Sequence, residues 1–102
     1  MRETLREAGA VAYASGMSGA GPLKIILSVH AAEAMASRGI DLAWVEATII
    51  APDWMQPDSR QGLTRSFKAI AAFDGRVLRV VHRPADDGVM VITTFFDRGA
   101  KR

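Results

Sequence analysis

Cysteine is absent from this chain of 102 residues. Its absence excludes disulfide bonds, thiolate metal ligands and a cysteine nucleophile. It also fits a reducing compartment, so we expect a cytoplasmic protein. Histidine is scarce, with only His30 and His82, and these do not have the paired spacing of a metal site. We therefore expect neither a metal nor a cofactor. The sequence also lacks a glycine-rich phosphate loop and a nucleophile elbow.

Long apolar runs are missing too. No segment approaches the ~18 consecutive apolar residues of a membrane-spanning helix, so we expect no membrane association. The N-terminal stretch "MRETLREAGAVAYASGMSGAG" has early arginines, a short apolar patch and small residues, as a secretion signal does. However, Glu3 and Glu7 interrupt its basic segment. We predict an extension over residues 1–22, made of a short helix and a flexible linker, with a cleaved signal as the alternative.

Charge is distributed unevenly, although the net charge is only +2. Residues 1–59 hold four lysines and arginines against seven acids, whereas residues 60–102 hold nine against four. A basic half on a nearly neutral protein indicates a face for an anionic partner. The alternative is that these cations only keep the protein soluble.

The first half of the chain predicts a strand over 24–29, a helix over 30–38 and a second helix over 42–50. The strand is a β-branched apolar run. Ser28 and Asp41 are the predicted N-caps of the two helices. Gly39 follows the first helix, as glycine often does just past a helix C-terminus.

The second half predicts a long loop over 51–62 and three strands over 63–73, 76–83 and 89–96. Two helices followed by a run of strands indicate an α+β fold. We expect two helices packed on one face of a twisted antiparallel sheet of three to four strands. This single domain is predicted to cover residues 23–97, and residues 98–102 form a basic tail.

The Asp74-Gly75 pair predicts a two-residue hairpin turn, which sets the register of the flanking strands. In that register Phe67 faces His82, on an apolar face that packs on the helices. The opposite face then gathers Lys68, Arg79 and Arg83 into one basic cluster.

This basic cluster is the best candidate for chemistry in the sequence. Metal-free cleavage of RNA needs a base for the 2′-hydroxyl, an acid for the leaving oxygen and cations for the phosphate. Lys68 and Arg79 are candidate catalytic residues. His30 is a third, because a helix N-terminus favours the neutral imidazole that serves as a general base. The alternative for His30 is a structural role at the start of the helix. Candidate nucleic-acid-binding residues are Arg38, Arg65 and Arg83.

The stretches "SVHAAEAMASRGIDLAWVEATIIAPD" and "LRVVHRPADDGVMVITTFF" resemble a family of small uncharacterised bacterial domains related to the RelE/ParE/BrnT toxins. The resemblance covers about residues 24–96. It implies a RelE-like fold and a ribonuclease toxin held inactive by an antitoxin. Lys68, Arg79 and Arg83 match the basic positions of RelE enzymes, and His30 and Arg38 match the pattern of the uncharacterised family. Phe95 and Phe96 stand where RelE enzymes carry a C-terminal tyrosine.

Two classes of function follow from these observations. The first is a toxin-like domain that acts on nucleic acid as a metal-free endoribonuclease of the RelE/BrnT type, with RNA as its substrate and a neighbour-encoded antitoxin as its partner. The second is a non-catalytic interaction module, in which the loop carrying Trp54 and Met55 binds a protein partner or a second copy in a homodimer. A ParE-like gyrase inhibitor shares the same fold.

Overall fold

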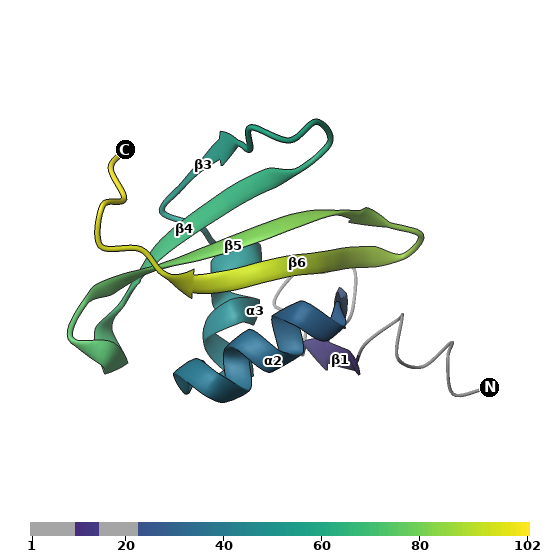
Figure 1. Cartoon of the computed structure of the whole chain (residues 1–102), viewed down its shortest axis with the longest axis horizontal. Coiled ribbons are helices and arrows are strands. Elements are labelled where there is room, and N and C mark those ends of the chain that lie inside the picture. The colour runs from purple at the N-terminus through teal and green to yellow at the C-terminus, as the bar shows by residue number, and fades with distance from the viewer. Residues whose placement is uncertain (1–9, 15–22) are drawn as a thin grey trace.

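The computed structural model describes residues 10–14 and 23–102, and within them two α-helices cover one face of a six-stranded sheet (Figure 1). The helices are α2 (Val29–Arg38) and α3 (Leu42–Ile50). The strands are β1 (Ala10–Ala14), β2 (Leu23–Leu27), β3 (Trp54–Pro57), β4 (Thr64–Ile70), β5 (Arg76–Ala85) and β6 (Gly88–Phe96). The predicted α+β class, with two helices on one face of a sheet, is confirmed. The sheet has more strands than predicted, and it is mixed where an antiparallel sheet was expected.

Strand order in the sheet is β1-β2-β6-β5-β4-β3. All neighbours are antiparallel except β2 and β6, which run parallel and bring the first and last parts of the domain together. Gly88 pairs with Lys24 across these two strands, and a Cβ at position 88 would overlap the carbonyl oxygen of Lys24. The parallel pairing therefore depends on a residue without a side chain.

Local signals place the helices as predicted. The Ser28 hydroxyl accepts a hydrogen bond from the Ala31 N–H at 3.0 Å, and it donates one to the Ile92 carbonyl at 2.9 Å, which ties the start of α2 to β6. Gly39 ends α2 in the left-handed conformation, with φ of 66°. Asp41 caps α3 by accepting from the Ala43 N–H at 3.0 Å.

The main core lies between the helices and the sheet. It is built from apolar side chains of β2, both helices and the central strands: Ile25, Leu27, Ala31, Met35, Val45, Leu78, Val80 and Val91. At one end of this core Phe73 contacts Trp44 and Phe96, with ring centroids 5.7 and 4.6 Å away. No helix in the described ranges is long and apolar enough to cross a membrane.

The predicted hairpin register is wrong. Pairing of β4 with β5 stops at Ile70 and Arg76, and residues 71–75 between them include a turn of 3-10 helix, Ala71–Phe73. Phe67 therefore pairs with Arg79, and not with His82. The longer turn prevails because it buries Phe73 against the aromatic rings of α3 and β6.

Two further predictions need correction. Part of the predicted loop over 51–62 forms the edge strand β3, in which Trp54 stacks on Phe67 with ring centroids 4.7 Å apart. In the predicted N-terminal extension, residues Ala10–Ala14 form strand β1, where a short helix and a linker were expected. The rest of that extension, residues 1–9 and 15–22, lies outside the described residues.

Candidate functional site

Lys68, Arg79 and Arg83 do not form the predicted cluster. The register places Lys68 opposite Leu78 on the helix side of the sheet, and Arg79 on the other side. The Lys68 ammonium donates to the Ala51 carbonyl at 2.8 Å and lies 3.7 Å from the Asp53 carboxylate. Arg83 is exposed near the β5–β6 turn. The register shift of three residues moves Lys68 to the face opposite Arg79. Arg83 lies four residues from Arg79 along β5, a distance of about 13 Å.

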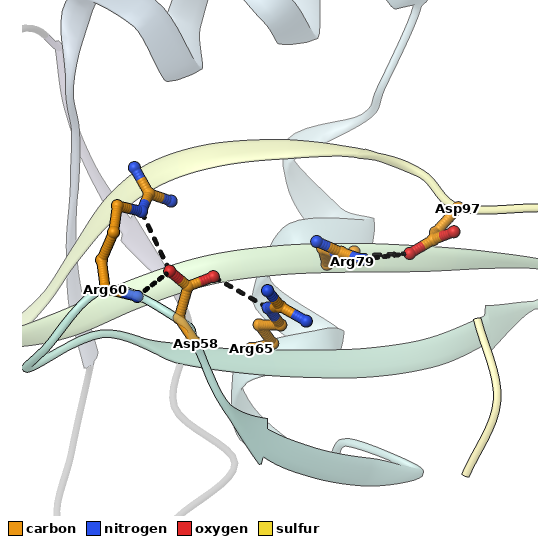
Figure 2. Close-up of polar contacts among 5 residues, drawn as sticks. All are labelled: Asp58, Arg60, Arg65, Arg79 and Asp97. Carbon is orange, nitrogen blue, oxygen red and sulfur yellow. Dashed lines mark hydrogen bonds and ion pairs between the residues drawn. The ribbon is translucent and has the colours of Figure 1, made fainter. Parts of the chain in front are cut away.

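The guanidinium of Arg79 contacts three side chains of the protein: Asp97, Phe95 and Phe67. Its guanidinium donates to the Asp97 carboxylate at 2.6 and 3.0 Å, a contact drawn in Figure 2. Its guanidinium carbon also lies 4.9 Å from the centre of the Phe95 ring and 5.6 Å from that of Phe67. The charge is thereby balanced and only 22% of the side chain is exposed, so Arg79 is suited to holding the sheet face together.

Arg65 is also held by a carboxylate. Its Nε donates to Asp58 at 2.8 Å, and Arg60 donates to the same carboxylate from its backbone N–H and its Nε, both at 2.9 Å (Figure 2). The hydrogen bond from Arg65, followed by those from Arg60, holds the pKa of Asp58 well below its usual range. Since only 3% of the Asp58 side chain is exposed, this contact fixes the loop before β4 to the sheet.

The two histidines lie apart from these groups. His30 is exposed in the first turn of α2, about 12 Å along the helix axis from Arg38 in the last turn. His82 lies on the helix side of the sheet, where its Nε2 is 2.8 Å from the hydroxyl of the buried Ser66. Burial lowers the pKa of His82 below its ordinary value. Both observations favour a structural role for the Ser66–His82 pair.

A cleft of about 740 Å³ lies at the end of the sheet where the β4–β5 turn, the C-terminal end of α2 and the segment after β6 meet. We call it the hairpin-end cleft. Arg38, Arg76 and Arg98 line it from these three segments. All three are exposed, and none forms an ion pair within the described part of the chain.

Aromatic side chains form the apolar wall of the hairpin-end cleft: Phe73, Phe95 and Phe96. The Arg76 guanidinium carbon lies 5.1 Å from the centre of the Phe73 ring. Cations next to aromatic rings are a suitable lining for a ligand that has both phosphate groups and flat rings.

Two carboxylates, Asp74 and Asp97, also line the hairpin-end cleft. Asp97 is neutralised by Arg79, and its second oxygen accepts from the Gly99 N–H at 2.9 Å. This contact forms the turn that carries Arg98 into the cleft. With Asp97 paired, three arginines and one acid remain, so the cleft has an excess of positive charge.

Of the site residues predicted from the sequence, Arg38 alone lines this cleft. Arg76 and Arg98 were missed because the assumed two-residue turn left no room for a cleft at this end of the sheet. A signal for both was present. Arg76 directly follows the predicted turn, Arg98 follows the last predicted strand by two positions, and each lies two or three residues after a phenylalanine. Among the described residues, no group of three or more histidine, aspartate or glutamate side chains is placed to hold a metal ion.

Residues 27–96, which run from the end of β2 to the end of β6, match the model of one protein family, the Domain of unknown function (DUF4258). The chain belongs to this family. The expected membership of a family of uncharacterised domains is thus confirmed. Most of the lining of the hairpin-end cleft falls within the DUF4258 domain, and Asp97, Arg98 and Ala100 lie just beyond it. No curated protein and no solved structure matches the chain.

Proposed function

We propose that this DUF4258 domain acts on RNA, which it binds in the hairpin-end cleft. The observation that carries the proposal is the convergence of Arg38, Arg76 and Arg98 beside aromatic walls, without carboxylate partners among the described residues. Arginine recognises phosphate through a planar fork of donors and stacks on flat rings, which suits a polyanion that carries bases.

The size of the cleft favours a single strand over a duplex. Its volume of about 740 Å³ is in the range that accepts a small organic molecule, which includes one nucleotide. An unpaired base can leave the strand and stack on an aromatic side chain, whereas a base within a duplex cannot. The phosphates on either side would then meet the arginines at the rim.

In the catalytic form of this proposal, the domain not only binds RNA but also cleaves it, as an endoribonuclease of the RelE/BrnT type. Within the cleft, arginines would stabilise the charge that develops on the phosphate during metal-free transesterification. Lys68 and Arg79, which were predicted to be catalytic, have protein partners elsewhere, and His30 lies at the far end of α2. The proposal therefore moves only the stabilisation of the phosphate charge to Arg38, Arg76 and Arg98. Water takes the proton of the attacking 2′-hydroxyl and supplies one to the leaving 5′-oxygen.

The proposal also includes the expected relation to the RelE/ParE/BrnT toxins. It keeps a neighbour-encoded antitoxin and a second copy of the chain, in a homodimer, as the expected partners. An outward-facing apolar hollow of about 300 Å³ on α3 offers a surface for a protein partner, and it is lined by Ala43, Glu46, Ala47, Ile50 and Ala51. A gyrase inhibitor of the ParE type is separated from the RNA-acting form by an assay of DNA supercoiling.

Binding of a fluorescent single-stranded RNA, measured by anisotropy at several salt concentrations, tests the proposal. Arg76→Gln is expected to weaken binding and to reduce the slope of log affinity against log salt by about 0.7, the value for one lost phosphate contact on a single strand. Arg83→Gln is the matched control, because it removes the same charge about 23 Å further along β5. Equal losses in both variants, or no binding by the unaltered protein, would contradict the proposal.

Cleavage is tested separately, by incubating the protein with RNA and a chelator and by following growth after expression. The catalytic form predicts RNA fragments and growth arrest, both relieved by Arg76→Gln and retained in Arg83→Gln. Intact RNA together with normal growth at high expression would refute the catalytic form and leave the binding proposal to the anisotropy experiment.

A further inference from the structure

Asp74 lies in the turn between β4 and β5 and lines the hairpin-end cleft together with the three arginines. It is the one non-glycine residue with a positive φ, 58°, in the described ranges. Aspartate and asparagine tolerate this left-handed conformation better than most residues. The turn therefore explains why a small polar residue occurs here, but it does not require a negative charge, because asparagine or glycine would serve the backbone equally well.

The carboxylate of Asp74 has no hydrogen bond and no ion pair to any residue that the structure describes. Asp97, the other acid of the cleft, differs in this respect, since Arg79 and the Gly99 N–H occupy its oxygens. Asp74 thus remains an open hydrogen-bond acceptor in a cleft whose other unpaired charged groups are the three arginine donors.

A free carboxylate is unfavourable in a site that binds only phosphate, because like charges repel. It becomes favourable when the ligand has a hydrogen-bond donor next to its phosphate. In a nucleic acid the ribose 2′-hydroxyl fulfils this condition, and it is the group by which proteins distinguish RNA from DNA.

We infer that Asp74 accepts a hydrogen bond from the 2′-hydroxyl of the nucleotide bound in the hairpin-end cleft, so that the site prefers RNA to DNA. This inference rests on the proposed function, since it needs a nucleic acid in the cleft. The arginines then bind the phosphates of any single strand, and Asp74 makes the site selective for ribose over deoxyribose.

The test compares the affinities of the full chain for three single strands of one base sequence: RNA, DNA and 2′-O-methyl RNA, which cannot donate from its 2′ position. The unaltered protein is expected to bind RNA about tenfold more tightly than the other two, as one hydrogen bond to a charged group implies. The readout is the ratio of the affinity for RNA to the affinity for each of the other two strands. Absolute affinities are not used, because removal of the Asp74 charge strengthens binding of every polyanion.

Asp74→Gly accommodates the positive φ and removes the acceptor, so the ratio is expected to fall to about one. Asp74→Asn keeps a weaker, neutral acceptor and is expected to give an intermediate ratio. Circular dichroism of both variants checks that the fold is retained.

Two results overturn the inference while the proposed function stands: equal binding of RNA and DNA by the unaltered protein, or an RNA preference that survives in Asp74→Gly. In both cases Arg76→Gln would still weaken binding. If no strand binds, or if Arg76→Gln has no effect, the proposed function fails and the inference fails with it.

Discussion

The Arg79–Asp97 ion pair offers the sharpest test of how the face of the sheet opposite the helices is held together. Its side chains are 22% and 15% exposed, and two hydrogen bonds of 2.6 and 3.0 Å join them. Asp97→Asn keeps the oxygen that accepts from Gly99, and it places an amide donor against the guanidinium. The substitution therefore removes the ion pair and leaves the turn that carries Arg98 intact.

The magnitude follows from the partial burial. A hydrogen bond to a charged group contributes about 1.5–3 kcal/mol, and breaking a fully buried pair costs about 3–5 kcal/mol. Because solvent reaches part of both side chains, we expect Asp97→Asn to lower the free energy of unfolding by about 2 kcal/mol. Much of this loss comes from the Arg79 cation, which remains between two phenylalanine rings without its counter-charge.

Urea denaturation followed by tryptophan fluorescence measures this cost. Arg79→Met and the double variant complete a double-mutant cycle, in which the double variant is expected to lose about 1 kcal/mol less than the sum of the single losses, because it contains no unpaired charge. A loss below about 0.5 kcal/mol for Asp97→Asn, or strictly additive losses, would refute the argument that the pair holds this face.

Three further predictions concern the fold. Gly88→Ala is expected to cost about 1–3 kcal/mol of unfolding free energy, because its methyl group overlaps the Lys24 carbonyl and separates β2 from β6; an unchanged urea midpoint would contradict this. Ser28→Ala is expected to cost about 1 kcal/mol through loss of the cap of α2, measured in the same way. His82 binds its proton less readily in the folded protein than in the unfolded chain, because burial lowers its pKa. Stability is therefore expected to fall as the pH drops through the ordinary value of about 6.5, and His82→Gln is expected to flatten this dependence. A variant with the same pH profile as the unaltered protein would refute this expectation.

The candidate site could be predicted only in part. Arg38 was a candidate because it matches the pattern of the family that the sequence resembles, and it does line the hairpin-end cleft. Arg76 was not recognised, because its neighbours depend on a turn whose length the sequence leaves open. The Asp-Gly pair is found in tight two-residue hairpins and also after a turn of 3-10 helix, and the burial of Phe73 decides between them.

Sequence by itself determined the local elements of this protein. The caps at Ser28 and Asp41, the left-handed Gly39 and the apolar runs of the strands act through neighbouring residues, so their effect is visible without the fold. Tertiary structure alone decided the pairing of β4 with β5, the parallel contact of β2 with β6 and the cleft at the end of the sheet. These depend on which distant side chains pack best, a sum of many small contacts between segments far apart in the chain.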